Sequence, residues 1–579
     1  MYHKYYKYIL GLSISMFLLS LIIFYVYLYI QFNDTLAFYT IDYRIHTWDE
    51  VVYYFNRITS FIELGHLNYH DGIDSNFSKL DLNIFPFLFN SLIYYVLGFE
   101  FFPIGINLVL GILLLYLFYY IFNRIFALNI YFSISASLLM LITFGYGPTT
   151  YIMLKPLFID LNNQWFLPPI ARQESPSTVL FILLTYFIFL YNFVCKEKKV
   201  FFLPLIIFSL INNFSYPYYI LYTFNVLSFA LIYVYFFEKK YFKTLFIATI
   251  INHIFFLAWY LLGKFNMSHD SDFIYTLIFD RSVDIKTLVI NGIFILIHII
   301  HINYQKAEQK KLSKILIVMY LAGICSYHFN VILGYKIENW HIDIYVLKPL
   351  QWISIIFFTL QIQFVRKYVV YIILFISTLF LIANNNYANS YILTKNKDIT
   401  TQISMYSSYK KIEPFVKGKL VLTLDPLFIM AGRTISNHYN YITFSGREIR
   451  RNVEQNLDNY IRASIIHKID KNQSLDHINK IDFTFIKGHK NYEPFKYIIF
   501  LNDQIDGIYQ SLNDYGSNIM EKDLKKIIYD RYDYLSEEKK MYNGFLLLNK
   551  HQFKKDNMFD SLEIVYEDNN IVLYEMVSK

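Results

Sequence analysis

The chain has 579 residues, of which 55% are hydrophobic and 20% aromatic, and its formal net charge is +7. This composition excludes a disordered chain and an ordinary soluble enzyme, and it indicates a polytopic membrane protein. The basic residues are spread through short loops, which predicts a membrane topology and no nucleic-acid partner, and two cysteines are too few for a thiolate metal site.

The first predicted element is the apolar run at residues 8–30. It is long enough to cross a bilayer and lacks a small-x-small cleavage site, so we interpret it as an uncleaved first span rather than a signal peptide. Lys4 and Lys7 precede the run, which predicts a cytoplasmic N-terminus.

A polar segment follows this span, and it begins with the sequence TWDE at residues 47–50. The sequence fits a capping box and predicts a helix over residues 48–64 that ends at Gly65. In this interpretation Glu50 accepts the backbone N–H of Thr47, and Asp49 favours the helix dipole. A carboxylate close to a bilayer is costly unless it faces a cavity or has a partner, so a chemical role for Asp49 stays open beside the capping role.

Eleven apolar runs reach or approach the length of a membrane span. They cover residues 8–30, 102–122, 128–146, 176–194, 200–215, 217–237, 244–262, 286–303, 314–332, 346–364 and 368–385. The run at 200–215 is short and also fits a re-entrant pair with its neighbour. The apolar stretch at 84–98 is shorter still, and we predict a helix that lies at the outer membrane surface.

Lysines and arginines recur in alternate loops between these runs, which fixes the predicted orientation. The localisation expected is the plasma membrane of a bacterium, with an extracytoplasmic C-terminal domain. The segments predicted outside are 31–101, which is the first outer loop, then 147–175, 263–285, 333–345 and everything after about residue 388.

One candidate for anion binding is Arg172, which stands at the outer end of a predicted span in the segment 164–181. An arginine suits phosphate because its planar fork can bind two oxygens. An interfacial anchor beside Trp165 is the alternative interpretation.

A second candidate is the segment 334–352, a short outer loop that holds an unusual number of charged residues. Glu338 and His341 are three residues apart, so one helical face can present both. Lys348 follows two turns later, where it can meet a lipid phosphate. The alternative is that Lys348 only extends toward the membrane interface while Glu338 pairs locally.

The spacing of His66, His70, Asp71 and Asp74 is compatible with a metal site, but no HExxH motif or tight triad appears. We therefore assign no metal ligands and no certain cofactor, and a divalent cation is the alternative.

The sequence changes character over residues 388–579, where charges become dense and no spanning run remains. The stretches KGKLVLTLDP, FKYIIFLND, NGFLLLNK and SLEIVYEDNNIVLYEM predict strands, and the last predicts a hairpin with its turn at residues 568–570. Residues 447–480 and 517–540 look helical. The fold class expected is therefore an α-helical polytopic membrane domain over 1–390, with interfacial helices, and a soluble α/β domain over 391–579.

The topology and three short segments carry a resemblance to a known family, and one of these segments is 164–181 with Arg172 and Pro176. The sequence DEVVYYFNRITSFIELG, directly after the first span, resembles the DE-x-x-Y pattern of the first outer loop of the GT-C superfamily. These are polytopic glycosyltransferases, among them the protein O-mannosyltransferases and the lipid A aminoarabinose transferases. The sequence GYKIENWHIDIYVLKPLQW resembles a Gly-x-x-x-Glu-x-x-His segment, followed by a basic residue and Pro, of GT-C-like proteins. The resemblance covers residues 1–390.

The resemblance implies transfer of a sugar from a polyprenyl-phosphate donor to an extracytoplasmic glycan, lipid or protein, with inversion. Asp49 would be the general base, with Glu50 in support. Such a reaction needs a carboxylate for the acceptor's proton and cations for the departing phosphate. The residues expected at the phosphate are Arg172, Glu338, His341 and Lys348.

Two other functions remain open from the sequence. A flippase or transporter of lipid-linked glycans would carry polar residues within its spans and often shows inverted repeats, and we find no repeat in the sequence. A polymerase or ligase of the O-antigen type would hold its functional arginines in a large late loop, whereas this chain has its richest loop after the first span.

Overall fold

A computed structural model describes most of the apolar N-terminal part of the chain and part of the C-terminal region. The described residues are 2–40, 55–65, 84–144, 175–215, 217–237, 241–267, 281–304, 307–333, 342–425, 427–441, 453–474, 529–537, 543–551, 559 and 562–576. The chain divides into two compact units. The first contains Met1–Gln31, Leu82–Phe265 and Phe279–Thr394, and the second contains Phe32–Asp81, Asn266–Ile278 and Lys395–Lys579.

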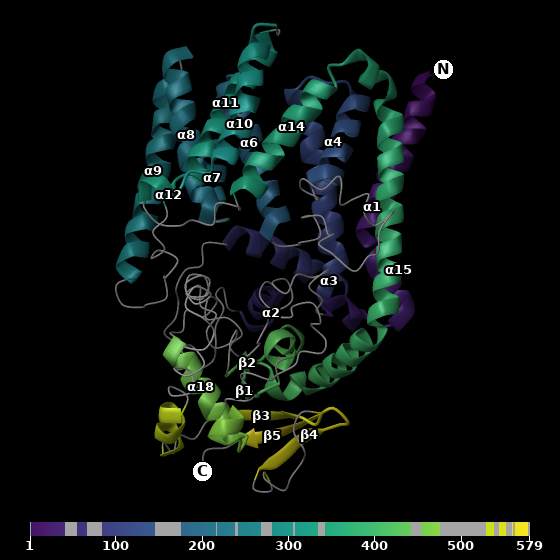
Figure 1. Ribbon diagram of the computed structural model, residues 1–579, viewed down its shortest axis with the longest axis vertical. Coiled ribbons are helices and arrows are strands. Elements are labelled where there is room, and N and C mark those ends of the chain that lie inside the picture. Colours follow the sequence, from purple (N-terminus) through teal and green to yellow (C-terminus); the bar gives the residue numbers. More distant parts are fainter. Residues whose placement is uncertain are drawn as a thin grey trace. The chain divides into compact units, whose positions relative to one another are not determined.

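The first unit is built from helices (Figure 1). The described residues of the eleven apolar runs are mostly helical, and the runs at 314–332 and 346–364 are each interrupted by a short turn. The helices are α1 (Tyr2–Phe32), α3 (Ile84–Tyr120), η3 (Ile121–Ile125), α4 (Ile130–Phe144), α6 (Ser175–Val194), η4 (Lys199–Phe201), α7 (Phe202–Asn213), α8 (Pro217–Phe237), α9 (Phe242–Met267), α10 (Ile285–Ile302), α11 (Ala307–Tyr327), α12 (Asn330–Leu333), η7 (Asp343–Leu347), α14 (Lys348–Thr359) and the first part of α15 (Gln363–Val416).

Within the described ranges, four helices are long and apolar enough to cross a membrane, judged by length and composition. They are Tyr5–Phe32, Phe85–Ile125, Tyr219–Phe237 and Ile285–Ile302. The apolar stretches of the other helices, such as Thr178–Val194 and Phe242–Ala258, are 10–17 residues long. The unit is therefore compatible with a membrane protein, and the number of eleven spans stays a prediction.

Helix α3 is broken at Gly98, whose φ of 71° and ψ of 171° are not helical. The two parts have different partners. Before the break, Asn90 accepts the hydroxyl of Thr178 in α6 at 3.2 Å, whereas after it the amide of Asn107 donates to the hydroxyl of Tyr25 in α1 at 3.0 Å. The predicted helix at 84–98 is thus a separate piece, and its position at a membrane surface remains a prediction.

Helix α10 buries polar side chains and exposes apolar ones. Its buried residues are Thr287, Asn291 and His298, whereas Leu296 and Ile300 are more than half exposed. A helix at the surface of a soluble protein shows the reverse pattern. Polar residues inward and apolar residues outward are expected of a helix that faces lipid.

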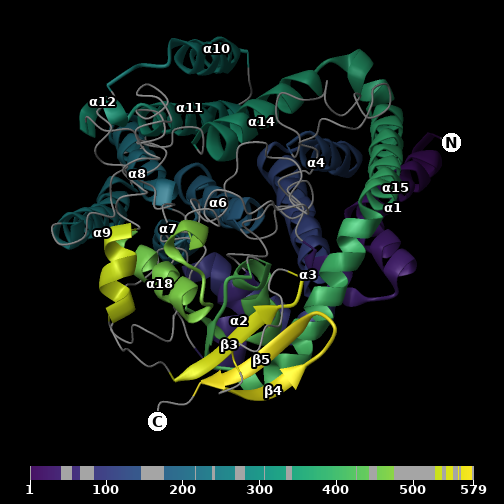
Figure 2. The same cartoon turned by 60° about the horizontal axis from the view of Figure 1, so that its bottom comes forward.

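The second unit contains a five-stranded mixed sheet in the order β2-β1-β3-β5-β4. Strand β1 lies between β2 and β3 and is parallel to both, and β5 is antiparallel to β3 and β4. Figure 2 shows β3, β5 and β4 side by side. The elements are η1 (Thr35–Tyr39), α2 (Phe55–Leu64), the last part of α15, β1 (Leu420–Leu422), η8 (Phe428–Gly432), α16 (Arg433–Ser436), β2 (Tyr439–Asn440), α18 (Val453–Ile466), β3 (Gly544–Asn549), β4 (Glu563–Glu567) and β5 (Ile571–Met576).

Several predictions for this sheet are confirmed. Strands β1 and β3 form in two of the predicted stretches, and β4 pairs with β5 as the predicted hairpin. Helix α18 lies within the predicted helical stretch 447–480, and residues 529–537 are helical within 517–540. The predicted strand FKYIIFLND lies outside the described residues. Helix α15 runs without a break through the last apolar run, 368–385, and continues to Val416.

Candidate functional site

The structure describes one of the six residues predicted for the site. Lys348 is the first residue of α14. The other five, Asp49, Glu50, Arg172, Glu338 and His341, lie outside the described residues, so the expected meeting of these side chains stays a prediction.

Lys348 is held by a carboxylate through a local departure from α-helical geometry. The preceding segment η7 is a π-helix, and the N–H of Lys348 donates to the carbonyl of Asp343, five residues back. This i→i+5 turn brings both side chains to one side of the helix, and Lys348 Nζ lies 2.8 Å from Asp343 Oδ2. Each side chain is 25% exposed, so the pair is accessible. Single π turns inside helices occur frequently at functional sites.

A second acidic group lies at the start of α10. Asp284 is the N-cap of this helix and accepts the backbone N–H groups of Lys286 and Thr287. Its other oxygen accepts the hydroxyl of Thr287 at 2.8 Å and the hydroxyl of Tyr327 at 2.9 Å. The Thr287 hydroxyl, helped by the other donors, lowers the pKa of Asp284 below its usual value, so this carboxyl is ionised at neutral pH.

Farther along α10, the polar side chains form a buried seam with α11 and α14. The Gln351 amide donates to Asn291 at 2.9 Å. His298 contacts the hydroxyl of Ser354 through Nε2 at 3.0 Å and that of Ser313 through Nδ1 at 3.4 Å. We call Asn291, His298, Ser313, Gln351 and Ser354 the α10 seam. It joins three helices by hydrogen bonds in an otherwise apolar setting.

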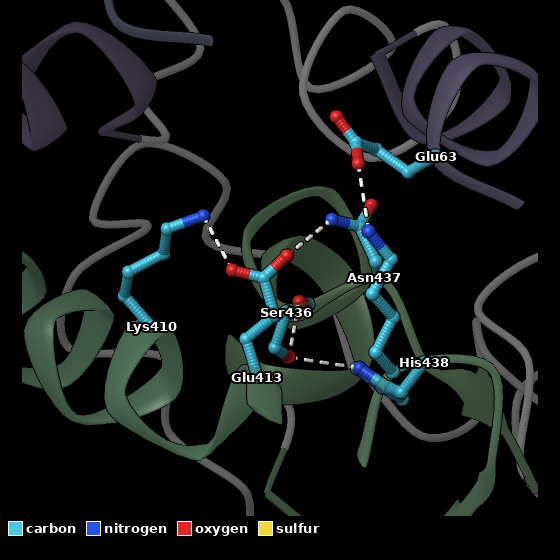
Figure 3. Close-up of polar contacts among 8 residues, drawn as sticks. Glu63, Lys410, Glu413, Ser436, Asn437 and His438 are labelled. Carbon is cyan, nitrogen blue, oxygen red and sulfur yellow. Dashed lines mark hydrogen bonds and ion pairs between the residues drawn. The ribbon is translucent and has the colours of Figure 1, made fainter. Parts of the chain in front are cut away.

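In the second unit, the last turn of α2 meets the turn between α15 and β1 (Figure 3). Lys417 Nζ lies 2.8 Å from Glu63 Oε2, and the amide of Asn437 donates to Glu413 at 2.8 Å. The N–H of Gly418 donates to the carbonyl of Asn437 at 2.9 Å. We call Glu63, Glu413, Lys417, Gly418 and Asn437 the α2 corner, since they join α2, α15 and α16.

A chain of polar contacts at Ser436, His438 and Asn440 has the residue types of a nucleophilic site. Ser436 Oγ lies 3.0 Å from His438 Nδ1, and His438 Nε2 lies 2.6 Å from Asn440 Oδ1. All three side chains are fully buried, so a substrate has no access to the hydroxyl. Burial, with a smaller effect from the charge of Arg433, lowers the pKa of His438 to about 3. These hydrogen bonds between Ser436, His438 and Asn440 therefore have a structural role.

Asp425, just after β1, is also enclosed. Its carboxylate accepts the hydroxyl of Tyr409 at 2.6 Å, the amide of Asn549 at 3.1 Å and the N–H of Leu427 at 3.0 Å. Burial raises the pKa of Asp425, and these donors oppose the shift. Because every one of these partners donates, the group is built as a satisfied buried acceptor.

In the described part of the chain, no group of three or more His, Cys, Asp or Glu side chains is placed to hold a metal ion. Four features of the structure were not predicted from the sequence: Asp284, the α10 seam, Asp425 and the α2 corner. For the seam a signal exists, because Thr287, Asn291 and His298 fall within about 40° of one another at helical spacing.

No protein-family model matches the chain, and no curated protein matches it.

Proposed function

We propose that the chain is a membrane glycosyltransferase that takes its sugar from a polyprenyl-phosphate donor. The observation that carries the proposal is the accessible Lys348–Asp343 pair on the π turn that opens α14. The pair lies within the segment 334–352, which resembles the GT-C pattern.

The chemistry of donor cleavage explains why such a lysine is useful. The leaving group departs as a phosphate anion, and a fixed cation stabilises the charge that develops on it. A lysine acts as a compact point charge on a flexible stem. Asp343 holds the ammonium at 2.8 Å, which limits its freedom before the donor arrives and so reduces the ordering cost of binding.

The remaining roles rest on the resemblance. Asp49 acts as the base that takes the proton of the acceptor, and Glu50 supports it. Arg172, His341 and Glu338 complete the phosphate site with Lys348.

The test uses the full chain in lipid vesicles with radiolabelled polyprenyl-phosphate sugars and a membrane extract as the source of acceptors. We expect transfer by the wild type, none by Asp49→Asn, and at least a tenfold loss in kcat/KM for Lys348→Ala, since removing a charge-assisted contact costs about 1.5–3 kcal/mol. Lys348→Arg should keep more activity than Lys348→Ala.

A matched control is Lys311→Ala. Lys311 is also ion-paired in the first unit, with Glu197 at 3.2 Å, and has a similar exposure of 32%. This substitution should leave transfer unchanged. Equal activity of Lys348→Ala and the wild type would remove Lys348 from the site, and absence of transfer with every donor would reject the proposed reaction.

A second candidate function is transport of a lipid-linked glycan, and the α10 seam favours it. Polar side chains buried between apolar helices mark substrate or proton paths in many transporters. Under this alternative, a fluorescent glycolipid in the same vesicles would cross the bilayer with the wild type but not with His298→Phe, and no sugar would be transferred.

A further inference from the structure

We propose that residues 395–579 position the first outer loop through α2, with Glu63 and Lys417 as positioning residues. This inference rests on the proposed function and adds a role for the C-terminal region. The compact unit that contains the sheet also contains residues 32–81 of that loop, among them η1 and α2.

The first step is the docking of α2. Phe55, Ile58 and Thr59 are each at most 1% exposed and lie on one helical face. Helix α2 contacts α16, whose four residues are all buried. Burial of this face ties α2 to the segment between β1 and β2.

The second step is the contact at the C-terminal end of α2. The Glu63–Lys417 ion pair lies in the α2 corner. At Gly418 a Cβ would come within 3.6 Å of the Leu64 side chain, so turn and helix are in close approach. Gly65 ends the helix with a φ of +73°, and its N–H donates to the carbonyl of Phe61.

The third step is the other end of the loop. The Tyr39 ring in η1 meets the Phe55 ring edge-on, with centroids 5.7 Å apart. Both rings are buried. The end of η1 and the start of α2 therefore lie next to each other. The segment that connects them contains the proposed base, Asp49. Anchoring both ends of this segment on the second unit restricts where that base can lie.

The test compares charge reversals in the full chain, namely Glu63→Lys, Lys417→Glu and the double swap, in lipid vesicles. Two quantities are measured: hydrogen exchange at the amides of residues 61–65, and kcat and KM for the sugar donor. An exposed ion pair contributes at most about a fivefold effect, so each single variant should exchange roughly two- to fivefold faster. We expect kcat to fall by a similar factor with KM unchanged, and the swap to restore both quantities.

The matched control is Lys471→Glu. Lys471 is 41% exposed and pairs with Asp533 at 3.0 Å in the same unit, and Lys417 is 42% exposed. This variant should change neither quantity. Glu63→Gln, which removes attraction without adding repulsion, should show a smaller effect in the same direction.

The outcomes separate the two proposals. Faster exchange with unchanged kcat would overturn the positioning role while leaving the transfer reaction intact. Unchanged exchange in the single variants would show that the ion pair does not hold α2, and would also overturn it. A wild type that transfers no sugar would reject the reaction itself, and the positioning role with it.

Discussion

At the scale of single residues, burial separates side chains that look alike in the sequence. Lys348 and Asp343 are accessible and paired, whereas Asp425 and His438 are enclosed by partners from several elements. A carboxyl group is therefore open to a ligand at Asp343 and closed to one at Asp425. One prediction concerns Asp425 and a second concerns His438.

Replacing Asp425 by Asn should destabilise the sheet. The carboxylate is surrounded by donors from Tyr409, Leu427 and Asn549, so an amide would turn an N–H group toward another donor. We expect the free energy of unfolding to fall by about 1–3 kcal/mol, read from hydrogen exchange at β1. Tyr409→Phe removes one donor only and should cost less. A neutral Asp425→Asn would show that these partners reorient freely.

Acid should weaken the second unit through His438. Its pKa is about 3 in the fold and 6.5 in the unfolded chain, so between these values the unfolded state binds more protons. The free energy of unfolding therefore falls as pH falls from 6.5 toward 3, by up to about 1.4 kcal/mol per pH unit. The raised pKa of Asp425 acts in the opposite sense, because that group favours folding at low pH and loses its contribution as pH rises through its folded pKa.

This prediction is checked by hydrogen exchange at β1 and β2 between pH 7 and pH 4, corrected for intrinsic exchange rates. His438→Gln should flatten the acid-side slope. His551→Gln, at an exposed histidine of the same unit, is the control and should leave the slope as in the wild type. An unchanged slope in His438→Gln would assign the acid sensitivity to other groups.

At the scale of elements, the sequence predicted what depends on local pattern. Apolar length was enough for the helices of the first unit, and alternation with a turn was enough for the β4–β5 hairpin. The π turn at 343–347 and the unbroken helix through residue 388 were not predicted, since neither has a local sequence signature. The α10 seam could have been predicted from the helical spacing of its polar residues. It was missed because the apolar run around them has a high mean hydropathy.

Gly98→Ala should destabilise the first unit or straighten α3. The backbone at φ 71° and ψ 171° is open to glycine almost alone, and a Cβ there would meet nothing within 4 Å. The expected cost of about 1–3 kcal/mol is therefore conformational. Gly11→Ala, inside α1 and equally free of contacts, should be neutral or slightly stabilising. Unfolding in bicelles would compare them, and equal stabilities would place Gly98 in an ordinary conformation.

Asn291→Leu should loosen α10. The substitution removes the acceptor of the Gln351 amide, and hydrogen bonds between membrane helices contribute about 0.6 kcal/mol on average and up to about 1.7. A double-mutant cycle with Gln351→Leu should therefore show coupling of about 1 kcal/mol in bicelle unfolding. Ile293→Leu, on the exposed face, is the control and should have no such coupling. Additive effects of the two seam substitutions would contradict the prediction.

At the scale of the whole molecule, the second unit depends on pairings between distant parts of the chain. Lys348 could be proposed from sequence because its segment is local and dense in charge. The α2 corner could not, since Glu63 carries no sign of a partner beyond the last apolar run. Assignment of residues 32–81 to the unit of the sheet follows only from three-dimensional contacts.

The Glu63–Lys417 pairing also has a consequence for how the protein is made. The two residues are 354 positions apart, and a ribosome adds about 5–20 residues per second. Helix α2 therefore waits roughly 20–70 s for its partner to be synthesised. During that interval Phe55 and Ile58 lack part of their final packing. For variants that weaken the α2 corner, the first expected defect is therefore misfolding with other parts of the growing chain, and not unfolding of the completed protein.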